Sequence, residues 1–512
     1  MNRLHDWLAR HPLVRDAIIF CIPALLFGAA LRLILLYYSP LAFWNADSRS
    51  FMGFTNGVMT EWYFSINEKR RYLYPIFMLP ISLLPGGTLR WLSWIQAAIG
   101  LLTVLPLAYI VRRVFTGWKW WIIPVTVLYA GMPVLIWYEH ELLADTLTFN
   151  YTVWIMAGWV AWTSQKDPVR ARRLWWCFFV PFAMFLLTKP SGKFLWPGLA
   201  IGILLVLGWR VLRWPQWAAI AALFLVSLTI GDEDQSSWLL YTSNFPLTRL
   251  DTPLHAEYKA EIKDWVQKTR AELDDYHRTE MDVHDFLRSP EDHPEYPLWQ
   301  KLAKEDDKGL NKLYHELSKE ALTSSPHLFL YIALTRLAGS ANQTDFDTDR
   351  FETSYYDEKF EKQYGSKRNT PSMLRIALGI PKDEPMPPYS TVRTWINPHP
   401  DFAGARFLVA YSDAYQRAGD LIYRPRGKPS TMLESRPSLL GWWVVLGTIL
   451  SLFSPWRNTI GVWSIALWGY GLAVFLLGVE LHRYFTPLWA LILLLLAIPL
   501  DGIYRLVLRR FS

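Results

Sequence analysis

The chain has 512 residues, of which 52% are hydrophobic and 16% aromatic, but only 19% are charged. Because a soluble domain carries about 25% charged residues, this composition excludes an ordinary soluble protein and indicates an all-α polytopic membrane protein. The net charge of +7 comes with basic clusters between apolar segments, which is the positive-inside pattern of membrane proteins. No basic segment with interleaved aromatic residues occurs in the polar part of the chain, so we exclude nucleic acid as a partner.

Apolar segments long enough to cross a bilayer as a helix recur along the chain. They predict about ten membrane spans, at residues 17–37, 88–111, 118–137, 142–163, 174–188, 191–208, 214–230, 439–455, 459–479 and 485–504. With the N-terminus in the cytoplasm, ten spans bring the basic clusters to the cytoplasmic side and leave the C-terminus there too. The expected location is a bacterial inner membrane, with the large polar loop in the periplasm.

The predicted spans divide the chain into three parts. Residues 1–230 form a transmembrane module of seven spans, residues 231–438 a mainly helical periplasmic domain, and residues 439–512 the last three spans. The first exterior loop, 38–87, contains an apolar stretch at 72–85 that is short and rich in proline. Such a stretch predicts interfacial or re-entrant helix and not a full crossing.

The large loop contains several helical patterns. Charged residues with spaced apolar positions over 254–276 predict a surface helix, and leucines at helical spacing over 310–321 predict a second one. The apolar stretch 327–337 is too short to span a membrane and predicts an interfacial helix. Residues 340–400 are rich in proline, aspartate, asparagine and aromatic residues, and we expect irregular structure there.

Ionisable side chains gather at the exterior ends of the predicted spans, where such groups are costly in lipid and tend to be functional. The acidic ones are Asp47, Glu139, Glu141 and Asp145, with Glu480 beside His482, and the basic ones are Lys69, Arg70, Arg71, Lys189, Lys193, His482 and Arg483. A carboxylate can take the proton of an acceptor hydroxyl. Cations can hold a lipid phosphate and stabilise the charge it gains on leaving. The set therefore predicts a base facing a phosphate clamp.

Asp47 directly follows the first span, so its carboxylate can reach a reacting group whose substrate is anchored in lipid. Glu141 and Asp145 are four residues apart, which predicts that they share a helix face, with Asp145 about one turn inside the fourth span. Each residue also has a structural alternative. Asp47, Glu139 and Glu141 are then solvated surface residues, and Lys189 only extends its ammonium toward the interface.

The order of several short motifs resembles a known family. Asp47 in the first loop is followed by Tyr72-Leu73-Tyr74-Pro75, Glu141-Leu142-Leu143-Ala144-Asp145, Leu187-Thr188-Lys189-Pro190-Ser191-Gly192 and His482-Arg483-Tyr484-Phe485-Thr486-Pro487. This order resembles the GT-C superfamily of membrane glycosyltransferases, in the branch of protein O-mannosyltransferases and lipid A aminoarabinose transferases. The likeness covers about 1–230 and 438–512.

The resemblance implies a GT-C-like bundle and an inverting transfer of a sugar from a polyprenyl-phosphate donor to a lipid, glycan or protein acceptor. It implies that Asp47 is the base. The donor-phosphate residues that it implies are Lys189, Arg483 and His482, and the implied site-lining acids are Glu141 and Asp145. From their position at the exterior side we add Arg70 or Arg71 as phosphate contacts and Glu139 as a further site-lining acid. Many family members carry two adjacent acidic residues in the first loop, whereas Ser48 follows Asp47 here.

Other functions remain open from the residues alone. One is a polymerase or ligase acting on lipid-diphosphate oligosaccharides, and another is a non-enzymatic transporter of a lipid-linked sugar. A transporter often shows inverted repeats, and the sequence has no half-to-half symmetry. No cluster with metal-ligand spacing, no Gly-rich phosphate loop and no nucleophile elbow occurs. No cofactor is therefore assigned, and the use of a divalent metal is left open.

Overall fold

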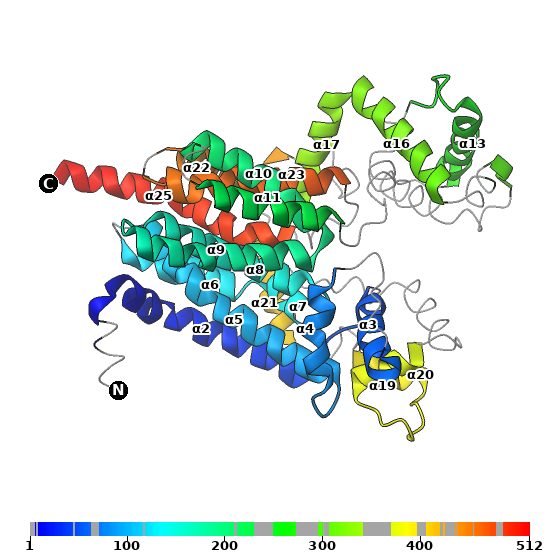
Figure 1. Cartoon of the computed structure of the whole chain (residues 1–512), viewed down its shortest axis with the longest axis horizontal. Helices are drawn as coiled ribbons and strands as arrows, with labels where there is room; N and C mark the ends of the chain where they lie inside the picture. Colours follow the sequence, from blue (N-terminus) through cyan, green and yellow to red (C-terminus); the bar gives the residue numbers. More distant parts are fainter. Residues whose placement is uncertain are drawn as a thin grey trace.

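The computed structural model describes residues 6, 9–44, 47–62, 71–115, 118–208, 212–229, 249–272, 295–298, 301, 307–340, 370–396, 406–419, 423–424, 436–437, 439–453, 455–477 and 485–511. Long helices run side by side in a bundle, and shorter helices cover one end of it, on the right in Figure 1. We call this the site end, because the loop that carries Asp47 lies there. The prediction of an all-α polytopic membrane protein is confirmed.

Each predicted span contains a helix. The bundle helices are α2 (Pro12–Tyr38), α5 (Thr88–Val114), α6 (Ile122–Ala130) with α7 (Pro133–Glu139), α8 (Asp145–Thr163), α9 (Pro168–Thr188), α10 (Leu195–Gly202), α11 (Trp214–Thr229), α22 (Leu439–Ser451), α23 (Val462–Leu477) and α25 (Trp489–Phe511). Short 3-10 or π-helical turns flank some of them, at η1 (Lys119–Trp121), η2 (Pro190–Phe194), η3 (Ile203–Leu207), η9 (Arg457–Gly461) and η10 (Thr486–Leu488).

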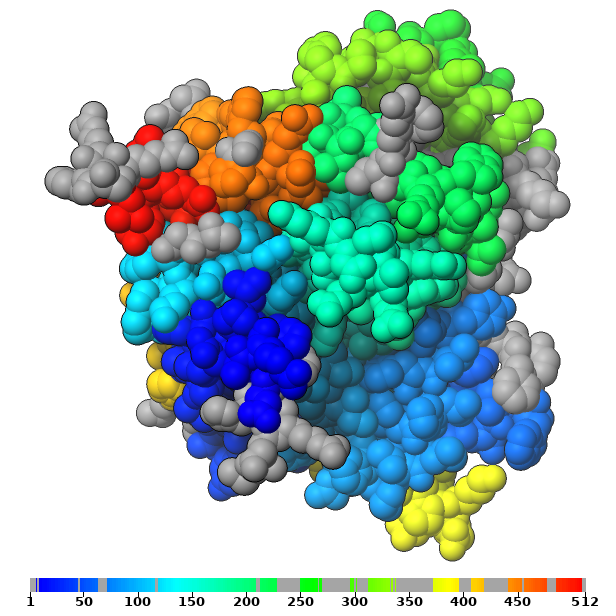
Figure 2. Space-filling view, turned by 60° about the vertical axis from the view of Figure 1, so that its left-hand side comes forward, coloured from blue at the N-terminus to red at the C-terminus, as the bar shows by residue number. Residues whose placement is uncertain are grey.

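Six of the described helical segments are long and apolar enough to cross a membrane, or seven if the bent pair formed by α6 and α7 counts as one span. Helix α2 begins, and helix α25 ends, at the end of the bundle opposite the site end (Figures 1 and 2). The number of ten spans stays a prediction.

The bundle packs closely where small residues let helices approach. A Cβ atom added at Gly158 of α8 would overlap the backbone of Cys177 in α9, and α8 and α9 form the most extensive helix pair among the described elements. Cys177 and Cys21 are both free thiols. The buried core continues from α8 into α5, α10 and α23, so α8 lies at the centre of the bundle.

Outside the bundle helices, the loops are also mainly helical. The first loop contains α3 (Ser48–Glu61) and α4 (Leu73–Ser82), and the later elements are α13 (Ala256–Glu272), α16 (Asp307–Ser324), α17 (Pro326–Ser340), α19 (Thr370–Leu378), α20 (Tyr389–Ile396), α21 (Arg406–Gly419), β1 (Tyr423–Arg424) and β2 (Arg436–Pro437). The two strands pair antiparallel. The apolar stretch in the first loop is helical, as predicted. The expectation of irregular structure over 340–400 is wrong for α19 and α20.

Helices of the segment 231–438 dock on the bundle at separate places. Helix α17 packs on α23, α19 packs on α3 and α5, and α21 packs on α2. The contact of α19 includes a hydrogen bond from Ser372 Oγ to Asn56 Oδ1 on α3. Tyr411 and Tyr415 of α21 each donate a hydrogen bond to a carbonyl at the end of α6. The segment is therefore fastened to the bundle at three points among its described helices.

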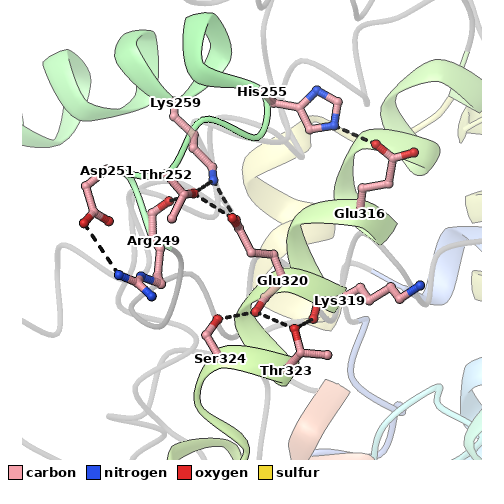
Figure 3. Close-up of polar contacts among 10 residues, drawn as sticks. All are labelled: Arg249, Asp251, Thr252, His255, Lys259, Glu316, Lys319, Glu320, Thr323 and Ser324. Carbon is pink, nitrogen blue, oxygen red and sulfur yellow. Dashed lines mark hydrogen bonds and ion pairs between the residues drawn. The ribbon is translucent and has the colours of Figure 1, made fainter.

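Helices α13 and α16 are joined by a polar cluster (Figure 3). The ammonium of Lys259, whose side chain is 0% exposed, lies 2.6 Å from Glu320 Oε2 and also donates to Thr252 Oγ1. His255 Nε2 lies 2.7 Å from Glu316 Oε2. Burial opposes ionisation of Glu320, but hydrogen bonds from Lys259 and Thr252 outweigh it and lower its pKa below the ordinary 4.5.

Replacing Glu320 with Gln is expected to weaken the joint between α13 and α16 by about 3 kcal/mol, because breaking a buried pair leaves an uncompensated charge on Lys259. The folded-state pKa of Glu320 is lowered, so its stabilisation is present above pH 4.5 and is lost as the pH falls through the folded value. Glu320→Gln should remove this pH dependence. Hydrogen exchange of peptides from α13, corrected for the intrinsic pH dependence of exchange and followed from pH 7 to well below pH 4.5, tests both expectations.

The matched control for this prediction is Asp264→Asn on the same helix, whose carboxylate pairs with Lys268 at 2.6 Å while both side chains are more than half exposed. Exposed pairs contribute little to stability. Equal effects of Glu320→Gln and Asp264→Asn would contradict the importance of the buried pair.

Candidate active site

The end of α7 is linked to the start of α8 by a segment that we call the acidic segment, residues 139–145. Its four titratable side chains, those of Glu139, His140, Glu141 and Asp145, are each only 2% exposed. Four such groups are costly to bury unless each is paired or hydrogen-bonded. The alternative that Glu139 and Glu141 are solvated surface residues is therefore wrong, and the partners of the segment show what holds it.

Glu139 is paired with Arg32 of α2. Arg32 Nε lies 2.6 Å from Glu139 Oε2 and Arg32 Nη2 lies 2.7 Å from Oε1, which is the bidentate geometry that gives strong, directional pairs. Gly100 of α5 lies directly behind this carboxylate, where a Cβ atom would overlap it. The pair thus fixes the first residue of the acidic segment between α2 and α5.

The backbone of the acidic segment is held by a side chain of α5. Gln96 Nε2 donates to the carbonyl of Glu139 at 2.9 Å and to the carbonyl of Glu141 at 2.8 Å. Tyr74 of α4 donates its hydroxyl to Gln96 Oε1 at 3.1 Å. Because all of these groups are buried, the first-loop helix α4 and the acidic segment are joined through one amide side chain.

The first loop pairs directly with the acidic segment. Phe43 and Glu141 form a parallel β-bridge, in which Phe43 N donates to His140 O at 2.7 Å and Leu142 N donates to Phe43 O at 3.0 Å. Ser48 Oγ then donates to Leu142 O at 3.1 Å. The residues on both sides of Asp47 are therefore fastened to the stretch that leads into α8.

Asp47 itself is the residue preceding α3, and its carboxylate makes no capping bond to the described first turn of that helix. Its backbone carbonyl accepts hydrogen bonds from Ser50 N at 3.0 Å and Ser50 Oγ at 2.6 Å. Of the four predicted carboxylates among the described residues, only that of Asp47 belongs to a partly exposed residue. A proton acceptor needs access to its substrate, and the partial exposure of Asp47 distinguishes it from the three buried acids.

Asp145 forms a buried ion pair with Lys189 Nζ. Asp145 is the first residue of α8, and Lys189 joins the end of α9 to η2. The turn that contains Lys189 is held further by Ser191, whose hydroxyl lies 3.4 Å from the hydroxyl of Tyr470 on α23. The alternative that Lys189 only extends into the interface is wrong, because its side chain is paired inside the protein. The pair connects the starts of α8 and η2 at the site end.

Two geometric expectations about the acids are wrong. Glu141 and Asp145 do not share a helix face, because Glu141 lies in the β-bridge with Phe43 and helix α8 begins only at Asp145. For the same reason Asp145 does not lie one turn inside a helix. The indole of Trp137 donates to Glu141 Oε1 at 2.9 Å, so the two acids have separate partners.

The predicted basic residues are described only in part. Arg71 lies at the start of the stretch before α4 and is 1% exposed. Lys193 lies in η2, with its ammonium 5.6 Å from the ring centre of Phe194. Lys69, Arg70, His482 and Arg483 lie outside the described residues. Their assignment to the donor phosphate therefore stays a prediction.

Sequence reasoning missed three residues that hold the site, namely Arg32, Gln96 and Tyr74. A signal for Arg32 was present, because it is a lone charge inside the apolar run of the first span, and such a charge needs a partner. Gln96 has a weaker signal of the same kind in the second span. Among the described residues, no group of three or more His, Cys, Asp or Glu side chains is placed to hold a metal ion.

Replacing Gly100 with Ala is expected to destabilise the protein by about 2 kcal/mol, because the added methyl overlaps the Glu139 carboxylate and forces it off Arg32. Alanine normally stabilises a helix relative to glycine by about 1 kcal/mol, so a loss identifies the clash. Gly502→Ala in α25 is the control, since its Cβ would meet Trp456 at an ordinary 3.6 Å. Thermal unfolding in detergent measures both, and a stabilised Gly100→Ala variant would contradict the expectation.

No family model matches the chain, and no curated protein matches it. A solved structure described as archaeal oligosaccharyltransferase AglB from Archaeoglobus fulgidus, in complex with an inhibitory peptide and a dolichol-phosphate, is similar to it with a TM-score of 0.42 and 11% identity. The match covers 98% of this chain and 52% of that one, so this chain spans about half its length.

Proposed function

We propose that this chain is an inverting membrane glycosyltransferase of the GT-C kind, which moves a sugar from a polyprenyl-phosphate donor to an acceptor hydroxyl. The observation that carries the proposal is the meeting of three segments at one end of a membrane bundle. The loop around Asp47 is hydrogen-bonded to the acidic segment, and the last residue of that segment, Asp145, is paired with Lys189. A partly exposed carboxylate and a cation thus belong to one connected unit.

In the proposed reaction Asp47 accepts the proton of the acceptor hydroxyl as the oxygen attacks the anomeric carbon. The bond between that carbon and the donor phosphate oxygen breaks, and its electron pair leaves on the polyprenyl phosphate. Attack opposite the departing phosphate inverts the anomeric centre. The proton on Asp47 is then released to water. General-base assistance of this kind contributes about 10²- to 10⁴-fold to a rate.

The departing phosphate gains negative charge, which needs cations near it. We assign this role to Lys189, His482 and Arg483, as the family resemblance implies, and to Arg70 or Arg71 of the first loop. Asp145 would keep the Lys189 ammonium at the head of α8, while Glu141 and Glu139 line the site from the acidic segment. Because Glu139 is already bound to Arg32 on both oxygens, we assign it no contact with substrate.

The proposal includes a location. The site end would face the periplasm of a bacterial inner membrane, together with 231–438, and both termini would face the cytoplasm. The donor would then lie in the membrane with its phosphate at the site end, while a lipid, glycan or protein acceptor approaches from water.

The test uses the full chain in lipid nanodiscs with radiolabelled sugars on polyprenyl monophosphate and, separately, oligosaccharides on polyprenyl diphosphate. We expect release of polyprenyl monophosphate that depends on the enzyme and on an acceptor extract. Turnover of the diphosphate donor alone would favour the polymerase or ligase. Movement of the labelled lipid across proteoliposomes without cleavage of its sugar–phosphate bond would favour the transporter.

A further inference from the structure

The third predicted span is broken. Helices α6 and α7 meet at an angle of 54° around Gly131 and Met132, next to Pro133, which cannot donate a backbone hydrogen bond. The last four carbonyls of any helix have no partner inside it. At membrane depth each such group must find a donor within the protein, because lipid supplies none.

Every carbonyl at the end of α6 has a donor. Val127 O accepts from Gly131 N at 3.0 Å and Tyr129 O from Met132 N at 3.3 Å. The other three donors come from distant parts of the chain. Tyr415 Oη donates to Leu128 O at 2.6 Å, Arg32 Nη1 to Ala130 O at 2.7 Å, and Tyr411 Oη to Gly131 O at 2.5 Å.

Of these three side chains, only that of Arg32 also binds the acidic segment, as far as the described contacts show. One edge of its guanidinium holds the Glu139 carboxylate at 2.6 and 2.7 Å, while Nη1 caps the carbonyls of Ala130 and Gly28. The guanidinium is planar and rigid, so these contacts are fixed relative to one another. The position of the broken helix end therefore determines the position of Glu139.

We propose that Arg32 is a positioning residue for the transfer reaction, which sets the place of the acidic segment from the break between α6 and α7. The inference rests on the proposed function. The position of Glu139 fixes the backbone of the acidic segment as far as Asp145. Through the β-bridge at Phe43 and the bond of Ser48 it also fixes the loop that carries Asp47. Helix α21 holds the same break through Tyr411 and Tyr415, so part of 231–438 acts on the site through this break.

The experiment compares Arg32→Gln, Arg32→Lys and Tyr411→Phe with wild type in nanodiscs. Its first readout is hydrogen exchange of the backbone amides in the acidic segment, where Leu142 N donates to Phe43 O at 3.0 Å and Glu141 N donates to Tyr138 O at 3.2 Å. Its second readout is kcat and KM for the polyprenyl-phosphate sugar. The control is Arg112→Gln, which breaks another arginine–carboxylate pair of α2, the 3.1 Å contact between Arg112 of α5 and Asp16 near the start of α2, away from the site.

Arg32→Gln should speed exchange in the acidic segment. It should lower kcat by about 100-fold, since small displacements of reacting groups are costly. KM for the donor should stay within about twofold of wild type, because the donor contacts remain. Arg32→Lys keeps the charge but loses the fork, and should recover about tenfold in kcat. Tyr411→Phe should speed exchange in the same amides, and Arg112→Gln should change neither readout.

The inference is overturned if exchange in the acidic segment is unchanged in Arg32→Gln, or if it rises while kcat stays at the wild-type value. Equal losses from Arg112→Gln would also overturn it, because they indicate a general loss of packing. If Arg32→Gln fails to fold, Arg32→Lys and Tyr411→Phe decide by the same two readouts. If wild type transfers no sugar, the proposed function fails, and the exchange comparison alone decides whether Arg32 and α21 set the segment.

Discussion

Replacing Asp47 with Asn is expected to lower the rate of sugar transfer by about 10³-fold while leaving the folded state intact. The amide keeps the shape of the side chain but cannot accept the acceptor proton, and general-base catalysis contributes about 10²- to 10⁴-fold. Ser50 binds the backbone carbonyl of Asp47 and Ser48 binds the carbonyl of Leu142, and both of these bonds are expected to remain in Asp47→Asn. The measurement is release of polyprenyl phosphate by Asp47→Asn in nanodiscs.

Glu61→Gln provides the matched control for Asp47→Asn. It removes a carboxylate from the last residue of the same helix, α3, where the side chain is exposed. Transfer by this variant should stay within about twofold of wild type, since surface substitutions change little. Asp47→Asn with wild-type transfer and an unchanged melting temperature would remove Asp47 as the base and require another acceptor of the proton.

Replacing Lys189 with Met is expected to cost about 3–5 kcal/mol in folding stability, because it leaves the buried carboxylate of Asp145 without its counter-charge. The same change removes a proposed phosphate contact, so transfer should fall as well. Loss of folding and loss of donor binding must therefore be separated. Thermal unfolding of Lys189→Met in detergent measures the first effect.

The double variant Asp145→Leu/Lys189→Met separates the two effects. Replacing both members of a buried pair with apolar residues is often neutral or stabilising, so the double variant should regain most of the stability lost in Lys189→Met. It should not regain donor binding, measured with a fluorescent polyprenyl phosphate, because the cation is still absent. Recovery of both stability and donor binding would show that Lys189 serves only the fold.

The membrane architecture could be predicted because hydrophobic length is a local property of sequence. Each predicted span contains a helix, and the short apolar stretch of the first loop forms α4. The break between α6 and α7 was not predicted, although Pro133 marks it, because the apolar run continues across it. The helices α19 and α20 were not predicted because they are only nine and eight residues long. Proline and polar residues flank each of them, so neither shows a helical pattern over a long window.

The acidic residues of the site could be found from their position at span ends, but their partners could not. Glu139 and Arg32 are 107 residues apart, and Asp145 and Lys189 are 44 apart, so no periodicity connects them. Helical spacing also misled the interpretation of Glu141, because a single β-bridge to Phe43 replaced the expected helix there. Both the burial of these acids and the counter-charge of each are decided by tertiary packing.

The capping of α6 by α21 has a consequence for how this protein is made. Tyr411 lies 280 residues after the carbonyl of Gly131, and Tyr415 lies 287 residues after that of Leu128. A ribosome delivers both carbonyls into the membrane long before it reaches either tyrosine, at a rate of about 5–20 residues per second. The early spans must therefore wait, with their broken helix incompletely bonded, until the chain beyond residue 415 has emerged and folded back onto them. Maturation of the N-terminal half is thus tied to completion of the segment that follows it.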